Sequence, residues 1–218
     1  MKPNYERAAT LALQTLIDNS ICKAPIDPFP FLKNHPGVMM FSFEEISSII
    51  NKDRKDIISS CRNSPDAITA TKLNGTELQY IVAYNKYLPI CVLQKAFARE
   101  LGHVVLGHDG TLPDDVRTAE AVCFAQHLLF PRPLLNAIMK SGLRLTTHVI
   151  SSITDCNAEC AMCMRQLPPI HVDPELNRIV RDQFAGYVQN YTEYQHMMKP
   201  KDVTDTVDLG RYMEGYEE

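Results

Sequence analysis

Residues 97–108 read FARELGHVVLGH, and this stretch decides how the rest of the chain is interpreted. Apolar residues recur here at the spacing of one helix face: Phe97, Leu101 and Val104. Gly102 would let a second backbone approach this helix closely, and Gly107 lies where the pattern stops. The sequence therefore predicts a helix between Cys91 and His108 with one face in the core.

The same helix carries three ionisable residues in a pattern close to HExxH. In an HExxH helix two histidines four residues apart hold zinc, and the glutamate beside the first activates the metal-bound water. Glu100 occupies the position of that glutamate and His103 that of the second histidine. Arg99 stands where the first histidine would be, and Glu120 on the next predicted helix is a candidate third ligand.

These residues lie within longer stretches that resemble the ImmA/IrrE family of zinc metallo-endopeptidases. FARELGHVVLGH followed by EAVCFAQHLLFP is similar to the family patterns FTLAHELGHLLLGH and EANxFAxxLLMP. Upstream, PIDPFPFLK, VMMFSFEEI and a hairpin ending in YIVAYN are also similar to that family. The likeness covers roughly residues 5–170.

The resemblance implies a zincin-like fold, bound Zn2+ and cleavage of a phage or mobile-element repressor, or of a related DNA-binding regulator. Carried over by position, it makes Glu100 the catalytic residue and His103 and Glu120 metal ligands. The implied partner is a helix-turn-helix repressor.

Arg99 departs from the family pattern at the first zinc ligand. A guanidinium has no lone pair to donate to a metal, and its pKa above about 12 keeps it charged. Arg99 could instead pair with Glu100 and Glu120 and supply positive charge without zinc. Cys123, three residues after Glu120, is a possible substitute ligand, although a buried core thiol is the plainer interpretation.

Two further histidines fit the metal site poorly. His127 is two turns from Glu120, which places it too far away. His108 is five residues past His103, which is roughly 140° around a continuing helix.

The fold class predicted for the chain is α+β, mainly helical, with a small antiparallel hairpin sheet. The hairpin is indicated by DAITATKLNGTELQYIVAYN, in which two runs rich in β-branched and aromatic residues flank Asn74-Gly75. We expect one domain over residues 1–170, followed over 171–218 by a C-terminal helix and an acidic flexible tail.

Composition excludes some classes of function. The 218 residues are 45% apolar and 22% charged, and the net charge of -4 offers no basic excess for nucleic acid. No apolar run is long enough for a membrane span, and the N-terminus lacks an export signal. Seven cysteines, an odd number in apolar surroundings, indicate reduced thiols and a cytoplasmic location.

Two other motifs are weaker. CNAECAMC has the CxxxCxxC spacing of radical-SAM enzymes, but Cys156, Cys160 and Cys163 also fit one face of a core helix. EEISSIINKDRKDIISS and ISSITDCNAECAMCMRQL resemble helix-turn-helix units without a basic patch, so direct DNA binding is unlikely.

Three functions therefore follow from the sequence. The chain is a peptidase with a reorganised metal site, or a non-catalytic pseudopeptidase that binds the same kind of regulator. The third and weakest is a DNA-binding regulator. Arg99 favours the second, and the presence of Glu100, His103 and Glu120 favours the first.

Overall fold

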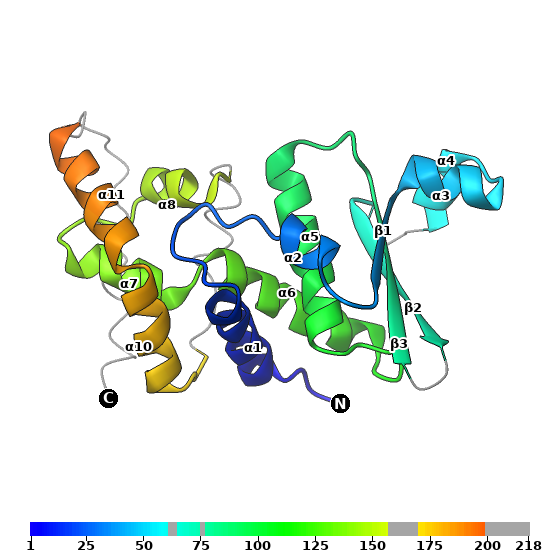
Figure 1. Ribbon diagram of the computed structural model, residues 1–218, viewed down its shortest axis with the longest axis horizontal. Coiled ribbons are helices and arrows are strands. Elements are labelled where there is room, and N and C mark those ends of the chain that lie inside the picture. The colour runs from blue at the N-terminus through cyan, green and yellow to red at the C-terminus, as the bar shows by residue number, and fades with distance from the viewer. Residues whose placement is uncertain (61–64, 75–76, 157–169, 199–218) are drawn as a thin grey trace. The chain divides into compact units, whose positions relative to one another are not determined.

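The computed structural model describes residues 1–60, 65–74, 77–156 and 170–198. This part of the chain is mainly helical and contains a three-stranded sheet, which confirms the α+β class (Figure 1). The chain divides into two compact units. The first comprises Met1–Ala8 and Asp27–Ala125, and the second Ala9–Ile26 and Gln126–Glu218. The boundary expected at residue 170 stays a prediction.

The first unit holds the sheet and most of the helices that the sequence motifs point to. Its elements are α2 (Phe29–Lys33), β1 (Val38–Ser42), α3 (Phe43–Ile50), α4 (Arg54–Ser60), β2 (Ala67–Asn74), β3 (Glu77–Tyr84), α5 (Ile90–Val105) and most of α6 (Asp114–Leu129).

The sheet has the strand order β1-β3-β2 and is mixed. β2 and β3 pair antiparallel, as the hairpin pattern predicts, with Ala67 opposite Tyr84. β1 adds to the other side of β3 in parallel, with Val38 opposite Tyr80. The prediction of a purely antiparallel hairpin sheet is therefore wrong in this respect, because a parallel neighbour joins the hairpin from earlier in the chain.

The outer edge of β1 is closed by local hydrogen bonds. The Ser42 amide donates to the Glu45 carboxylate at 2.5 Å, and the Val38 amide donates to the His35 carbonyl at 3.2 Å. Ser42 and Glu45 form a capping box that also starts α3. An incoming strand would find few free amides along this edge.

Helix α5 buries the face that the sequence assigns to the core. Phe97, Leu101 and Val104 are all buried, and the Phe97 ring contacts Phe29 and Tyr84. A Cβ at Gly102 would lie 3.0 Å from the Ala121 carbonyl oxygen. The expected close approach of a second backbone at Gly102 is thereby confirmed, and that backbone belongs to α6.

The second unit is helical over its described residues. It contains most of α1 (Tyr5–Asp18), the end of α6, α7 (Arg132–Lys140), α8 (Thr147–Thr154), α10 (Pro174–Gln183) and α11 (Ala185–Met197). The sequence predicts one C-terminal helix after residue 171, but the chain forms two helices that are separated at Phe184. The Gln183 amide side chain donates to the carbonyls of Leu16 and Ile21 and so fixes this end of α10 to α1.

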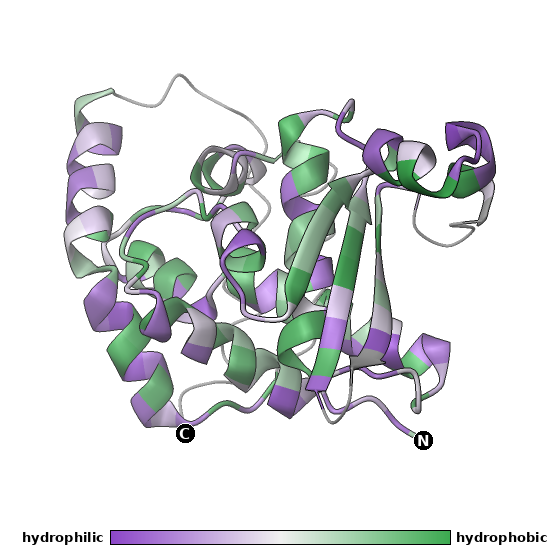
Figure 2. Cartoon of the chain, turned by 45° about the vertical axis from the view of Figure 1, so that its right-hand side comes forward, coloured by the Kyte–Doolittle hydropathy of each residue, from purple (hydrophilic) through white to green (hydrophobic). Residues whose placement is uncertain are grey.

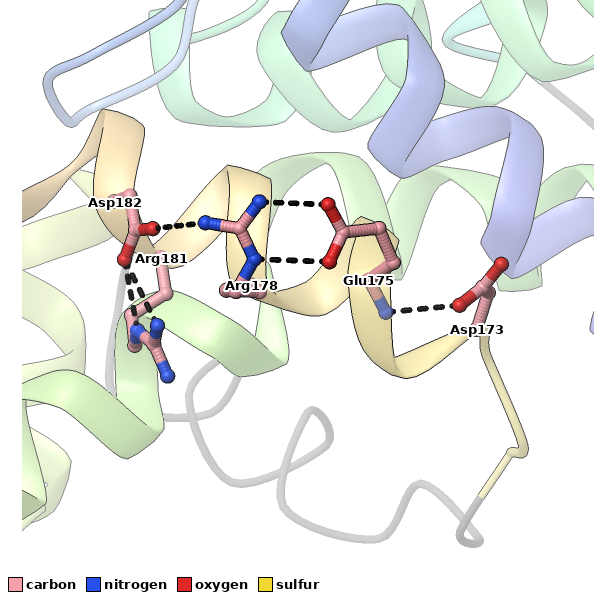
Figure 3. A network of polar contacts seen from close by, with 5 residues as sticks. All are labelled: Asp173, Glu175, Arg178, Arg181 and Asp182. Carbon is pink, nitrogen blue, oxygen red and sulfur yellow. Dashed lines mark hydrogen bonds and ion pairs between the residues drawn. The ribbon is translucent and has the colours of Figure 1, made fainter.

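A network of surface charges covers α10 (Figure 3). The Asp173 carboxylate accepts from the Glu175 amide and caps the helix, and Arg178 bridges Glu175 and Asp182. Arg181 pairs with the same Asp182. These side chains are half exposed, so the pairs add helix stability and little else.

Helices α3 and α4 each combine a hydrophobic side with a hydrophilic side. Figure 2 shows this as green and purple segments along α3 and α4. Phe43 and Ile57 on these helices pack with Ala83 of β3 in a small apolar cluster. No helix within the described ranges has both the length and the apolar character needed to cross a bilayer.

Some sequence predictions fall outside the described residues. Gly75 of the hairpin turn, Cys160 and Cys163 of the cysteine motif, and the acidic tail from residue 199 onward belong to this group.

Replacing Gly102 tests the close packing of α5 on α6. Gly102→Ala places a methyl group 3.0 Å from a backbone oxygen, and we expect the free energy of unfolding to fall by about 1–2 kcal/mol despite the better helix propensity of alanine. Gly186→Ala in α11 is the matched control, because its Cβ would meet nothing within 4 Å. It should raise stability by about 0.5 kcal/mol. Urea unfolding of both variants measures the difference, and equal shifts would contradict the close contact.

Candidate functional site

Arg99 and Glu100 of α5 lie beside the start of β2. Arg99 donates from Nε and Nη2 to Glu100 Oε1, at 2.9 and 2.7 Å. Nη2 also donates to the carbonyl oxygen of Ala67, at 2.9 Å. Thr69 Oγ1 donates to the second oxygen, Glu100 Oε2, at 2.7 Å. One carboxylate and one guanidinium therefore join α5 to β2.

Burial makes this pair necessary. Glu100 is 2% exposed, while the Arg99 side chain is 19% exposed. A buried carboxylate without a cationic partner would carry a desolvation cost of several kcal/mol. The charge of Arg99 and the hydroxyl of Thr69 together satisfy both Glu100 oxygens. In this arrangement neither oxygen is left without a donor.

The C-terminus of α5 brings a second histidine to His103. Gly107 has a φ of +69°, its amide donates to the Val104 carbonyl, and the His108 amide donates to the His103 carbonyl. These two bonds define a Schellman motif, in which the side chains at the two ends of the longer bond come together. The Nδ1 atoms of His103 and His108 lie 2.9 Å apart.

The position of His108 corrects the helical-wheel argument. Counting five residues along a continuing helix puts His108 roughly 140° from His103. The helix ends at Val105, and the left-handed Gly107 reverses the chain, so that count does not apply. A glycine directly after a helical run was the available signal in the sequence.

His108 links His103 to Glu120 in a buried polar chain. His108 Nε2 lies 3.0 Å from Glu120 Oε2, and Glu120 Oε1 accepts from the Asn4 amide at 2.6 Å. A carboxylate only accepts, so His108 Nε2 carries the proton and His108 Nδ1 accepts from His103 Nδ1. His103 Nε2 is then the nitrogen with an unshared lone pair. Glu120 is thus tied to His108 and Asn4.

Electrostatics keep both imidazoles neutral. Burial, followed by the neighbouring His108, Arg99 and Arg117, lowers the pKa of His103 to about 3. Burial also lowers the pKa of His108, against an opposing effect of Glu120. Two neutral rings can share one proton between facing Nδ1 atoms, which is what the 2.9 Å separation requires.

Cys123 lies one turn after Glu120 on α6 and is buried. Its Sγ is 3.6 Å from the Tyr5 carbonyl oxygen, so the thiol is directed to the N-terminal segment. Burial, together with the charge of Glu120, raises the pKa of Cys123 to about 12. A zinc ligand must be a thiolate, and these surroundings favour the protonated thiol.

The arrangement of these side chains does not fit the three-ligand zinc site that the resemblance implies. Arg99 cannot coordinate a metal, the Glu120 oxygens accept from His108 and Asn4, and the Cys123 thiol stays protonated. Across the described parts of the chain, no three His, Cys, Asp or Glu side chains are grouped as metal ligands.

The outer edge of β2 lies next to this cluster and presents backbone groups. The Asn85 amide donates to the Asp66 carbonyl, so residues 66, 68 and 70 point their backbone groups at β3. Residues 67, 69 and 71 then point theirs away from the sheet. Arg99 takes the Ala67 carbonyl, which confirms this alternation. Among the residues that the structure describes, none pairs with the outward backbone groups of Thr69 and Thr71, and these groups form the open part of the edge.

A hollow belongs to the second unit. It has a volume of about 570 Å³ and lies among α7, α10 and α11, with Lys140, Val188 and Thr192 in its wall. Two of its charged residues, Arg181 and Asp182, are paired with each other. It lacks the convergent buried polar groups of the first unit, which is why the α5–β2 region is the candidate site.

Comparisons with known proteins give no relatives: no family model, curated protein or solved structure matches the chain.

Removing His108 tests the buried polar chain. His108→Ala leaves the carboxylate of Glu120 buried with one hydrogen bond fewer, and we expect the free energy of unfolding to fall by about 3 kcal/mol. His148→Ala is the control, because His148 is exposed and should change stability by less than about 0.5 kcal/mol. Chemical denaturation of both variants measures the free energy of unfolding. A small loss of stability in His108→Ala would contradict the buried hydrogen bonds from His103 through His108 to Glu120.

The state of Cys123 can be read from alkylation. With a pKa of about 12, about one Cys123 in ten thousand is a thiolate at pH 8, so the folded protein should resist iodoacetamide there. Cys22 is exposed and should react at once. Mass mapping of the two peptides, before and after urea, gives the result. Rapid labelling of Cys123 in the folded protein would reopen its role as a metal ligand.

Proposed function

We propose that this chain is a metallopeptidase-like domain that binds a protein regulator without cleaving it. The proposal rests on the sequence resemblance to the ImmA/IrrE family and on one structural observation. That observation is the ion pair between Arg99, at the position of a zinc ligand, and Glu100, at the position of the catalytic glutamate.

The ion pair removes what hydrolysis would need from Glu100. A general base must have an oxygen free to accept a proton from water. Here Arg99 and Thr69 donate to both oxygens, and the side chain is almost completely buried. The same contacts stabilise the packing of α5 against β2, so the residue has a structural use without catalysis.

Binding is supported by the edge of β2. An extended segment of a partner can pair with Thr69 and Thr71 through main-chain hydrogen bonds, which is a common mode of peptide recognition. The corresponding edge of β1 is closed by His35 and Glu45. The resemblance suggests a helix-turn-helix repressor as the partner.

The rival proposal is an active peptidase with a rebuilt zinc site. It is favoured by His103, whose Nε2 keeps a lone pair, and by Glu120, which is one imidazole away. Direct DNA binding is the weakest proposal. Arg54 of α4, the central basic residue of the first helix-turn-helix-like stretch, is paired with Glu44.

Zinc content separates binding from catalysis. We expect protein purified with zinc present to hold far less than one equivalent, because His103 and Glu120 are too few ligands. Arg99→His restores a third ligand and should raise the zinc content towards one equivalent. Elemental mass spectrometry of both proteins gives the comparison, with Gly186→Ala as a control of the same purification.

Each result bears on the choice. Near-stoichiometric zinc in the unchanged protein would favour the rebuilt peptidase and overturn the non-catalytic proposal. If neither the unchanged protein nor Arg99→His binds zinc, the resemblance to the family is one of sequence pattern and not of a metal site. A helix-turn-helix repressor that is the partner should form a complex when mixed with the chain and should stay full length on a gel.

A further inference from the structure

The open edge of β2 ends at a cation. Pairing along the edge can use the backbone groups of Thr69 and Thr71, but the next outward carbonyl, that of Ala67, already accepts from Arg99. A segment docked on this edge therefore runs into the Arg99 guanidinium at one end.

From this we infer that Arg99 selects a carboxylate at the C-terminal end of the docked segment, supplied by an Asp or Glu side chain or by a chain terminus. The inference rests on the proposed function and names the chemistry that the site would recognise.

Arg99 has hydrogen-bond donors left for such a group. A guanidinium has five N–H bonds, one on Nε and two on each Nη. Contacts within the described residues use three of them: one from Nε and two from Nη2. Both Nη1 donors make no such contact. Donors on a cation favour an ionised acceptor over a neutral one.

The two partners of the ion pair differ in what an incoming group meets. The Arg99 side chain is 19% exposed to solvent, and the Glu100 side chain is 2% exposed. A segment approaching from solvent therefore contacts the guanidinium and not the carboxylate.

Strand direction gives the end of the segment that carries the carboxylate. β2 runs from Ala67 to Asn74, so an antiparallel partner has its C-terminal end beside Ala67 and Arg99. A parallel partner would bring its N-terminal end there. The recognised ligand is thus an antiparallel extended peptide with a carboxylate where its pairing ends.

Three peptides test the inference. Each peptide has lysines at its N-terminal end, which keep it soluble, followed by alternating threonine and valine. One is neutral at its amidated C-terminus, one ends in an amidated glutamate, and one ends in a free carboxylate. Titration is followed through the amide NMR signals of Thr69 and Thr71 and the Nε–H signal of Arg99. We expect one or both carboxylate peptides to bind about tenfold more tightly than the neutral one, and their order identifies the source of the carboxylate.

Two variants assign the effect. Arg99→Gln/Glu100→Gln removes both charges together, which avoids an unpaired buried carboxylate, and should bring the carboxylate peptides down to the affinity of the neutral one. Thr71→Pro removes an outward amide, which a strand edge tolerates, and should weaken all three peptides. Thermal unfolding by circular dichroism checks that both variants are folded.

The outcomes keep the two proposals apart. If no peptide shifts Thr69 or Thr71, the docking edge of the proposed function is wrong, and so is this inference. If all three bind equally, docking stands and the selection by Arg99 is overturned. A carboxylate preference that survives in Arg99→Gln/Glu100→Gln would also overturn it.

Discussion

The structure of the first unit depends on how the buried carboxylate of Glu100 is neutralised. A carboxylate that is 2% exposed needs a cation and further hydrogen bonds to remain ionised inside a protein. Arg99 and Thr69 supply them from α5 and β2. The same contacts set the distance between helix and strand, and they decide which backbone groups of β2 are left open.

A guanidinium and a zinc ion solve this electrostatic problem with different consequences. Zinc in a catalytic site keeps an open coordination position, where a water becomes reactive. Arg99 is covalently fixed, carries one charge and offers only donors. It can hold a carboxylate in place but cannot activate water. Positive charge at this point of the helix is thus compatible with an intact fold, but a guanidinium does not supply the chemistry of a metal.

Local patterns in the sequence predicted local structure well. The apolar spacing of α5, the close approach at Gly102 and the β2–β3 hairpin follow from short-range rules. The parallel pairing of β1 was missed because it joins residues about forty positions apart, and no local pattern records such a partner. His108 was missed because a helical wheel assumes that the helix continues beyond Val105.

The two edges of the sheet show how local sequence controls where a partner can pair. At β1 the chain enters a helix at once, and the Glu45 carboxylate of the capping box accepts from the outward amide of Ser42, the last of the strand. At β2 the Thr69 and Thr71 hydroxyls donate to Glu100 and Asp109, while their outward backbone groups have no partner among the described residues. Unpaired strand edges in natural proteins are commonly covered, because they invite unspecific pairing. An edge that is left open for a short length, and that ends at a fixed cation, limits both the length and the charge of whatever pairs with it. Under the proposed function, specificity in this unit follows from the same Arg99 contact that neutralises Glu100.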